Sequence, residues 1–137
     1  MKREIKFRGK VKHHDPMTNP ENGWVEGYYF KDLTQGEMRS YIFQVPCSWE
    51  VIPDTVGQFT GLLDKNGKEI WEHDIVDWDG VKLLVEFIDG GFCMRENYED
   101  ATLHDLFFER DKINVVGNIY DKDFGYVIKN TKTNNIG

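Results

Sequence analysis

The sequence predicts a mostly β protein, and three observations support this fold class. Aromatic residues make up 14% of the chain, with nine Phe, six Tyr and four Trp, a composition typical of strands. Short alternating runs of polar and apolar residues recur, and turn signals such as Asn-Gly and Asp-Gly separate them. The segment from Gln58 to Tyr120 has five such strands with one helical turn before the last. This layout predicts an SH3-like small β-barrel at about residues 58–120, with additional N-terminal strands and one short helix.

The first 57 residues are predicted to form an N-terminal β region that adds strands to the barrel or makes a small second lobe. Residues 3–8 alternate, with Ile5 and Phe7 on one face, as in a half-buried strand. Residues 10–22 hold two Pro and two Asn without periodicity, which predicts a loop. We expect the other elements to be strands at 23–30 and 40–45, a turn or one helical turn at 32–39, and a strand, turn and strand at 48–62.

The sequence DKNG, residues 64–67, predicts a tight turn with two possible registers. A two-residue hairpin on Asn66-Gly67 would place like charges directly opposite each other, which is unfavourable. A type I turn over all four residues, with Gly67 left-handed in a bulge, pairs Asp64 with Lys68 instead. Asp at the first position and Gly at the last suit this second turn, and we therefore favour it.

Asp79-Gly80 at the centre of a two-residue turn predicts a hairpin over residues 73–88. A one-residue slip would mix its apolar and charged faces, so the register is strongly specified. The following turn has two possible centres, Asp89-Gly90 and Gly90-Gly91, and both keep the apolar residues of the next strand on the core face. In the predicted register, the charged face of the hairpin carries two opposite-charge pairs, Asp77 with Lys82 and His73 with Glu86.

The last 36 residues, 102–137, predict a helix, a strand and a polar tail in this order. Residues 102–111 have apolar side chains three and four apart, with Thr102 as a plausible N-cap, and predict a short helix. Residues 113–120, INVVGNIY, predict the last strand. From 121 to 137 the chain grows polar, which predicts a strand end followed by a flexible tail.

Charge and cysteine usage limit the function classes. Seventeen Lys and Arg against 24 Asp and Glu give a net charge of −7, which disfavours sequence-independent binding of nucleic acid. Cys47 and Cys93 have no metal-ligand spacing and are expected to be reduced thiols. The start has no secretory pattern, and no apolar run approaches the ~20 residues of a membrane span. We expect a soluble, cytoplasmic protein without membrane contacts.

Acidic residues gather between the two turn signals, which raises the question of a metal site. Such a site for a hard cation needs several oxygens converging on one point, and the spacing lacks the calcium-loop pattern. Asp74 lies on the apolar face of the hairpin, where we expect it to accept hydrogen bonds from backbone N–H groups of a nearby turn. We therefore expect a charge-paired hairpin, no metal and no cofactor.

The residues that could act in catalysis do not form a recognisable set. His13, His14, His73 and His104 do not have the spacing of a transition-metal site. Neither cysteine has a base close to it in the sequence, and apolar neighbours raise the pKa of a thiol. The chain also lacks a nucleophile elbow, a phosphate loop and a dinucleotide fingerprint. We therefore expect no catalytic residues and no enzyme activity.

The aromatic segment at residues 24–30 is the best candidate for a functional surface. Trp24, Tyr28, Tyr29 and Phe30 lie so close together that strand alternation cannot place them all on one face. Either the rest of the chain or a second subunit covers them, or they form a groove that binds a peptide or nucleic-acid bases. The candidate partner-binding residues are Trp24, Tyr28 and Tyr29.

Three motifs span nearly the whole chain. They are REIKFR at residues 3–8, FTGLLDKNGKEIWEHDIV at 59–76 and NVVGNIYD at 114–121. In this order they resemble the start, the signature and the closing motif of the YopX family of small phage and prophage proteins. His73 stands where the family usually has glycine, and Trp71 where it usually has tyrosine. The resemblance implies an SH3-like β-barrel part and carries over no activity and no catalytic residues.

These observations favour a phage or prophage accessory protein that acts by binding. A non-catalytic protein-interaction or self-assembling module comes first, with a homo-oligomer or a host or phage protein as the partner. A nucleic-acid-associated small β-barrel is the alternative, and an enzyme comes last. The alternative requires a local basic surface, for which the candidates are Lys2, Arg3, Lys6, Arg8, Lys10 and Lys12.

Overall fold

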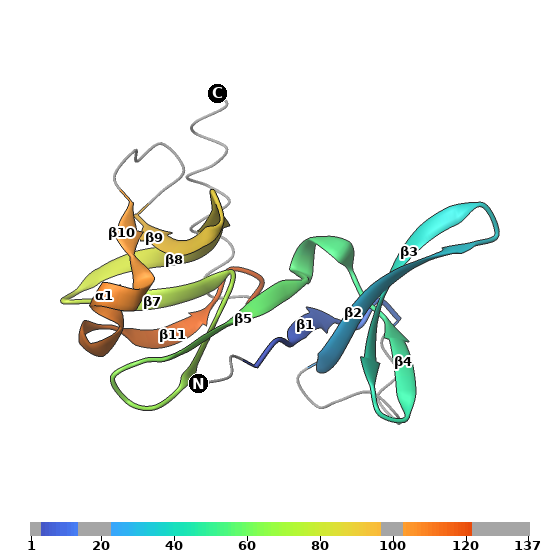
Figure 1. The fold of residues 1–137 in the computed structure, drawn as a ribbon, viewed down its shortest axis with the longest axis horizontal. Coiled ribbons are helices and arrows are strands. Elements are labelled where there is room, and N and C mark those ends of the chain that lie inside the picture. Colours follow the sequence, from blue (N-terminus) through green and yellow to red (C-terminus); the bar gives the residue numbers. More distant parts are fainter. Residues whose placement is uncertain (1–3, 14–22, 97–102, 122–137) are drawn as a thin grey trace. The chain divides into compact units, whose positions relative to one another are not determined.

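Strands dominate the computed structural model, which describes residues 4–13, 23–96 and 103–121 (Figure 1). The mostly β prediction is confirmed. The chain divides into two compact units, Met1–Phe59 and Thr60–Gly137. The strands are β1 (Phe7–Lys10), β2 (Trp24–Thr34), β3 (Glu37–Gln44), β4 (Cys47–Glu50), β5 (Gly57–Leu63), β6 (Glu69–Trp71), β7 (Asp74–Trp78), β8 (Val81–Ile88), β9 (Gly91–Arg95), β10 (His104–Asp105) and β11 (Asn114–Asn118). The helical elements are the 3-10 helix η1 (Pro53–Thr55), the α-helix α1 (Leu106–Glu109) and the 3-10 helix η2 (Arg110–Lys112).

The N-terminal unit is an antiparallel sheet in the order β4, β3, β2, β1 and β5. Val11, just after β1, bridges Val51, just after β4, so the sheet curls. The inner face of this sheet encloses a core of Val25, Ile42 and Val51, each at most 1% exposed. The predicted order of strand, Pro-Asp turn and strand over 48–62 is confirmed as β4, η1 and β5.

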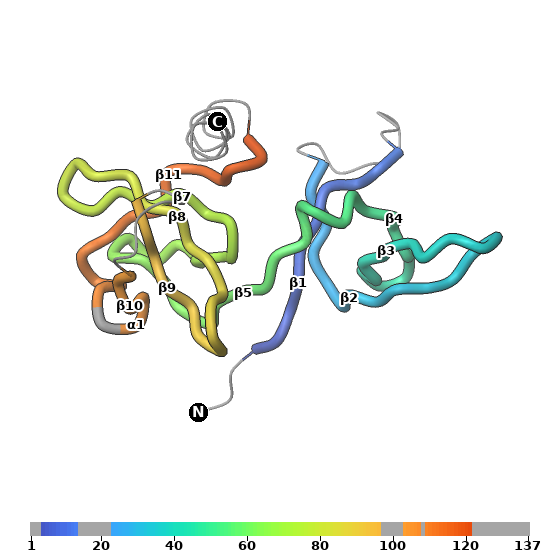
Figure 2. Tube along the Cα trace, turned by 90° about the horizontal axis from the view of Figure 1, so that it is seen from above, coloured from blue at the N-terminus to red at the C-terminus, as the bar shows by residue number. Residues whose placement is uncertain are grey.

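The hairpin of β2 and β3 is longer than the sequence predicts. Residues 32–39, expected to form a turn or a helical turn, continue both strands, and the register runs unbroken from Tyr28 opposite Phe43 to Thr34 opposite Glu37. Gln35 and Gly36 alone make the turn, with φ of 52° and 82°. These two left-handed residues form a type I′ turn, whose twist matches that of the strands. The end of the hairpin extends beyond β4 in both views (Figures 1 and 2).

The C-terminal unit contains an antiparallel sheet in the order β10, β9, β8, β7 and β11, and β6 pairs with the end of β5. Among the described residues this sheet does not close, so the predicted SH3-like barrel is not confirmed. Closure requires strands long enough to tilt and stagger around an axis, and β10 has only two residues. The main core lies on one face of the sheet and comprises Ile70, Val76, Leu83, Val85, Met94, Leu106 and Ile113.

Two of the predicted turns in this unit are confirmed, and one open choice is resolved. Asp64 N donates to Lys68 O at 2.8 Å, and Gly67 has a φ of 83°, as the type I turn with a bulge requires. Asp77 lies opposite Lys82 around the Asp79-Gly80 turn. The next turn is centred on Asp89-Gly90, because Ile88 pairs with Gly91.

The pair of His73 with Glu86 was predicted wrongly. His73 has a φ of 76°, so it stands outside the regular ladder, and its N–H donates to Val85 O at 2.8 Å. Its imidazole lies edge-on to the Tyr120 ring, with 5.5 Å between the centroids. The Glu86 carboxylate forms an ion pair with Arg95 instead.

The short helix predicted for residues 102–111 is reduced to one turn, α1, followed by η2. His104 and Asp105 form β10 instead, where pairing with β9 satisfies their backbone groups. Phe107 N donates to Asp105 Oδ1 at 2.8 Å, so Asp105 caps the turn. The predicted cap, Thr102, lies outside the described residues.

Both ends of the chain differ from the prediction or fall outside the description. The first strand begins at Phe7 rather than at residue 3, and Ile5 is 61% exposed rather than half-buried. The last strand, β11, has a bulge between Val115 and Gly117. Most of the predicted 10–22 loop and the tail from residue 122 lie outside the described residues.

The Asp79-Gly80 turn provides a test of the hairpin register. Both residues have positive φ, 53° and 89°, as in a type I′ turn. Gly80→Val should lower the free energy of unfolding by on the order of 1 kcal/mol or more, because a β-branched side chain resists this region. Asp79→Gly is the matched control and should change stability little. Urea denaturation measures both, and an unchanged Gly80→Val variant would contradict the register.

Candidate partner-binding surface

The aromatic side chains of β2 are divided between the two faces of the sheet. Val25, Gly27 and Tyr29 share the inner face with the core, and the residues between them point outward. The same alternation holds on β3, where Ile42 is buried between two outward aromatic residues. We use the name outer aromatic face for the aromatic residues on this outward side, which are Trp24, Tyr28, Phe30, Tyr41 and Phe43.

Tyr29 belongs to the core rather than to the exposed surface. Its ring lies 5.7 Å from the Phe7 ring, centroid to centroid. Its hydroxyl is within hydrogen-bond distance of Ser40 Oγ, at 3.2 Å, and Ser40 is buried. The structure therefore places Trp24 and Tyr28 together on the outer aromatic face and leaves Tyr29 on the opposite side.

Trp24 is half-buried beneath two cations. The guanidinium of Arg8 lies 4.8 Å from the centre of its ring, and the ammonium of Lys10 lies 5.5 Å from it. Such cation–π contacts are worth about 0.5–1 kcal/mol at exposed sites. They fix the Trp24 ring against β1 and add positive charge to this end of the face.

Tyr28 and Phe30 form the most exposed part of the face, at 68% and 39% exposure. Phe30 stacks on Tyr41 across the hairpin with centroids 5.2 Å apart, and Tyr28 lies opposite Phe43. Sequence reasoning did not assign Tyr41 and Phe43 to the surface. Strand alternation combined with the Gln35-Gly36 turn would have identified them, because that turn fixes which residues lie opposite each other.

Glycine is required at position 27, where β2 lies against the backbone of β3. A Cβ atom built on it would lie 2.0 Å from the carbonyl oxygen of Phe43, and its φ is 157°. The backbones of β2 and β3 therefore approach each other closely between Val25 and Tyr29, and a residue with a Cβ atom would not fit at position 27. A larger residue at position 27 would therefore displace the backbone next to Tyr28.

The two units differ in net charge. Residues 1–59 contain eight Lys and Arg and eight Asp and Glu, whereas residues 60–137 contain nine and 16. The N-terminal unit is therefore neutral, and the whole net charge of −7 belongs to the C-terminal unit. Repulsion of phosphate by net negative charge is therefore expected of the C-terminal unit alone.

Most cations near the outer aromatic face lie against carboxylates. Lys6 lies 3.0 Å from Glu4, and Lys12 lies 3.2 Å from Glu50. Partial burial alone would raise the pKa of Glu50, but the hydrogen bond from Lys12 and the charges of Lys12, Arg39 and His13 together lower it. The unit thus presents mixed rather than purely positive charge around its aromatic residues.

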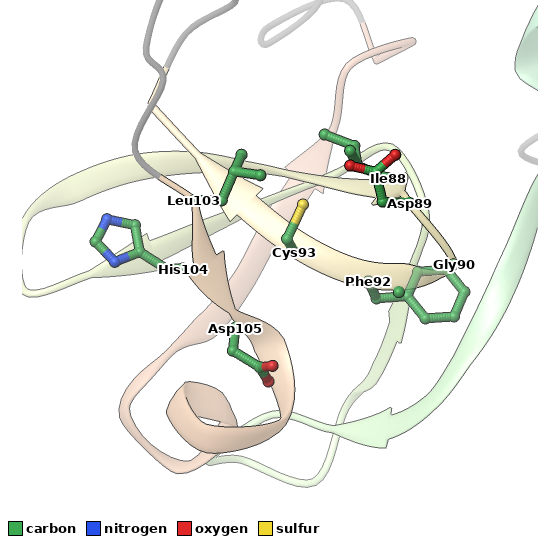
Figure 3. A pocket seen from close by; sticks show the side chains of 9 residues that line it. Ile88, Asp89, Gly90, Phe92, Cys93, Leu103, His104 and Asp105 are labelled. Carbon is green, nitrogen blue, oxygen red and sulfur yellow. The ribbon is translucent and has the colours of Figure 1, made fainter.

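A pocket of about 360 Å³ beside β9 and β10 is lined by a cysteine, a histidine and an aspartate (Figure 3). His104 lies opposite Met94 and Asp105 opposite Cys93, so His104 and Cys93 project to opposite faces of the strands. Figure 3 shows the His104 ring directed away from the Cys93 sulfur. Burial, followed by the charge of Glu86, raises the pKa of the Cys93 thiol, which lowers its thiolate fraction.

Two of the acidic residues between the turns, Asp74 and Asp77, are engaged in structural contacts. Asp77 forms an ion pair with Lys82 and accepts a hydrogen bond from Gly80 N, and these contacts lower its pKa. Asp74 is 2% exposed and accepts a hydrogen bond from Trp71 N at 2.8 Å, as predicted. The described residues contain no group of three or more His, Cys, Asp or Glu that could hold a metal ion.

Comparison with known families agrees with this arrangement of motifs. The family model described as YopX protein matches residues 6–123. The chain belongs to the YopX family. None of the curated proteins matches it. Among the described residues of this YopX protein, no helix is long and apolar enough to cross a membrane.

The signature and closing motifs of the YopX chain meet through two buried carboxylates. Asp64 accepts hydrogen bonds from Asn66 N and Lys68 N in its own turn and from Val115 N on β11, at 2.8, 2.9 and 2.8 Å. Asp74 accepts a second hydrogen bond from Asn118 Nδ2 at 3.1 Å. The two motifs are therefore parts of one hydrogen-bonded structure rather than separate sites.

His73 allows the departure from the family pattern to be tested. Its φ of 76° is a conformation that glycine adopts without strain, which explains why glycine suits this position. His73→Gly and His73→Ala both remove the contact with Tyr120, but only alanine keeps the strained φ. The glycine variant should be more stable than the alanine variant by about 1 kcal/mol. Equal melting temperatures, or a more stable alanine variant, would contradict the strain.

The metal question has a direct test. Millimolar Ca²⁺, Mg²⁺, Mn²⁺ or Zn²⁺ added to chelator-treated protein should not raise the melting temperature. The reason is that the Asp74 and Asp77 oxygens already accept hydrogen bonds from the protein itself. A bound ion at ~100-fold over its Kd would stabilise the fold by about 2.7 kcal/mol. A saturable increase that disappears in Asp77→Asn would show that a metal site exists.

Proposed function

We propose that this YopX protein is a phage- or prophage-derived accessory protein that acts as a non-catalytic protein-interaction module. The outer aromatic face is its partner-binding surface, and the partner is a host or phage protein. The observation that carries the proposal is the exposure of Tyr28 and Phe30, 68% and 39%, beside half-buried Trp24.

The composition of the face supports a protein partner. Trp, Tyr and Arg are the residues most enriched among those that dominate binding energy in protein–protein interfaces. Here Trp24, Tyr28 and Arg8 lie on adjoining strands of one sheet. β2 pairs with β1 at Trp24 and with β3 at Tyr28, so the backbone that carries these side chains is already ordered, and little backbone entropy is lost when a partner binds.

The C-terminal unit supports the non-catalytic part of the proposal. A nucleophile needs a base within hydrogen-bond reach, and the register separates Cys93 from His104. The meander of β7, β8 and β9 with a helical turn before β11 is consistent with an SH3-like module, a fold that often serves binding. We infer that this unit is a scaffold or a second binding module.

Single-stranded nucleic acid is the second candidate for the same face. The contacts of Arg8 and Lys10 with Trp24, together with the neutral charge of residues 1–59, favour it. Aromatic side chains on an open sheet can stack on bases while cations follow the phosphates. The carboxylates against Lys6 and Lys12 argue against it, because they would repel the same phosphates.

Capture from a lysate of cells that carry the gene tests the proposal. The tagged wild-type protein should retain a protein partner that resists nuclease treatment and is lost in Tyr28→Ala and Trp24→Ala. Phe87→Ala is the matched control, because Phe87 is an aromatic residue of the other unit with 48% exposure. All variants should keep the far-UV circular dichroism spectrum of the wild type.

Fluorescence anisotropy with a single-stranded oligonucleotide separates the two candidates. We expect no binding that depends steeply on salt. Salt-dependent binding lost in Tyr28→Ala would replace the protein partner with nucleic acid. A retained protein that Tyr28→Ala and Trp24→Ala bind as well as the wild type does would contradict the outer aromatic face as the binding surface.

A further inference from the structure

The end of the β2–β3 hairpin, which we call the hairpin arm and define as residues 31–40, leaves a backbone edge open. β4 pairs with β3 only from Tyr41 to Gln44, and β1 pairs with β2 only from Trp24 to Gly27. Among the described residues, no strand pairs with the outer edge of Glu37–Arg39. A two-stranded ribbon is marginally stable in water, and an open edge is a template for another strand.

The register shows which backbone groups face this edge. The pair next to the two-residue turn, Thr34 with Glu37, exchanges hydrogen bonds within the arm, and the pattern then alternates along the strands. The N–H and C=O of Met38 therefore point away from β2. Two residues further on, Ser40 O accepts a hydrogen bond from Val51 N at 2.9 Å on that same outer side, in agreement with the alternation.

The exposed apolar side chains of the arm share one face with Lys31 and Ser40, and the other charged side chains lie on the opposite face. Leu33 and Met38 lie opposite each other, 65% and 63% exposed. On the other face Asp32 lies opposite Arg39, and Arg39 lies 3.4 Å from Glu37. Lys31 and Arg39 balance Asp32 and Glu37, so the arm has no net charge.

We propose that the edge of β3 at Glu37–Arg39 pairs with the same edge of a second copy of this chain, across a two-fold axis through Met38. In this antiparallel register each Met38 donates one hydrogen bond to the other copy and accepts one from it. Glu37 of each copy then lies opposite Arg39 of the other copy. A two-fold interface must be self-complementary, and this pattern of an acid, an apolar residue and a base around one centre meets that condition.

The pairing also brings the exposed apolar side chains of the two arms side by side. The two ribbons become a four-stranded sheet, and one face carries an apolar row of Leu33, Met38 and the same two residues of the second copy. The other face carries alternating charges, since Asp32, Arg39 and Glu37 of the second copy follow each other across the strands. A neutral arm does not repel its own copy, whereas nucleic acid would require net positive charge.

The test uses a charge pair across the proposed axis. Wild-type protein under reducing conditions should shift from monomer to dimer mass as its concentration rises, measured by sedimentation velocity. Met38→Lys alone and Met38→Glu alone place like charges opposite each other, and both should stay monomeric. An equimolar mixture of the two variants places Lys opposite Glu and should recover the dimer.

Leu33→Lys and Leu33→Glu form the matched control, because Leu33 has almost the same exposure as Met38 but lies on β2, away from the axis. Mixing these two variants should not increase the dimer fraction over either one alone. A wild type that is monomeric at every concentration, or a dimer that survives Met38→Lys, would overturn the proposal, and so would a Met38 mixture that stays monomeric. Retention of the protein partner by the Met38 variants keeps this outcome separate from that of the outer aromatic face.

Discussion

The C-terminal unit depends on two buried carboxylates, Asp64 and Asp74. They are 6% and 2% exposed, and a carboxylate at such depth destabilises a fold unless hydrogen bonds satisfy it. Asp64 accepts two hydrogen bonds from its own turn and one from Val115 on β11, which lies 51 residues further along the chain. Asp74 accepts one from Trp71, three residues before it, and one from Asn118 on β11, 44 residues further along. These bonds join the turn-rich signature motif to the last strand and position β11 at the edge of the sheet.

The need of carboxylates for hydrogen bonds also limits what the acidic residues between positions 69 and 79 can bind. Carboxylate oxygens that accept backbone hydrogen bonds are poorly placed to converge on a cation, so Asp74 and Asp77 serve the fold. Among the described residues, the N-terminal unit has the most exposed aromatic side chain, Tyr28, with Phe30 beside it on the outer aromatic face, and Leu33 and Met38 are exposed on the hairpin arm. The proposed binding function rests on this hairpin, and the internal hydrogen bonds of the C-terminal unit belong to its fold.

Local chemistry made part of this structure predictable from the sequence. Asp-Gly turns fix a register within two residues, and Asp74 had to be satisfied by a nearby turn because alternation placed it on the apolar face. Long-range geometry was not predictable in this way. Barrel closure depends on strands far apart in the chain, and the pairing of His104 and Asp105 with β9 overrode their helical period.

The candidate surface, too, was only partly predictable from the sequence. The aromatic cluster was visible in the sequence, but its division between two faces required the position of the β2–β3 turn. Without Gln35-Gly36 as the centre, Tyr29 could not be assigned to the core or Tyr41 to the surface. His73 was paired with Glu86 because an L-residue with positive φ gives no signal in the pattern of charges.

Residue-resolved amide hydrogen exchange is the most direct test of the role of the two buried carboxylates. It also tests whether the backbone edge of the hairpin arm is open. We expect the amides of Trp71 and Val115, which donate to Asp74 and Asp64, to exchange in the slowest class. The amide of Met38 should exchange rapidly in dilute protein and more slowly as the concentration rises. Exchange of Trp71 and Val115 as fast as that of Met38 in dilute protein would contradict the central role of the two carboxylates.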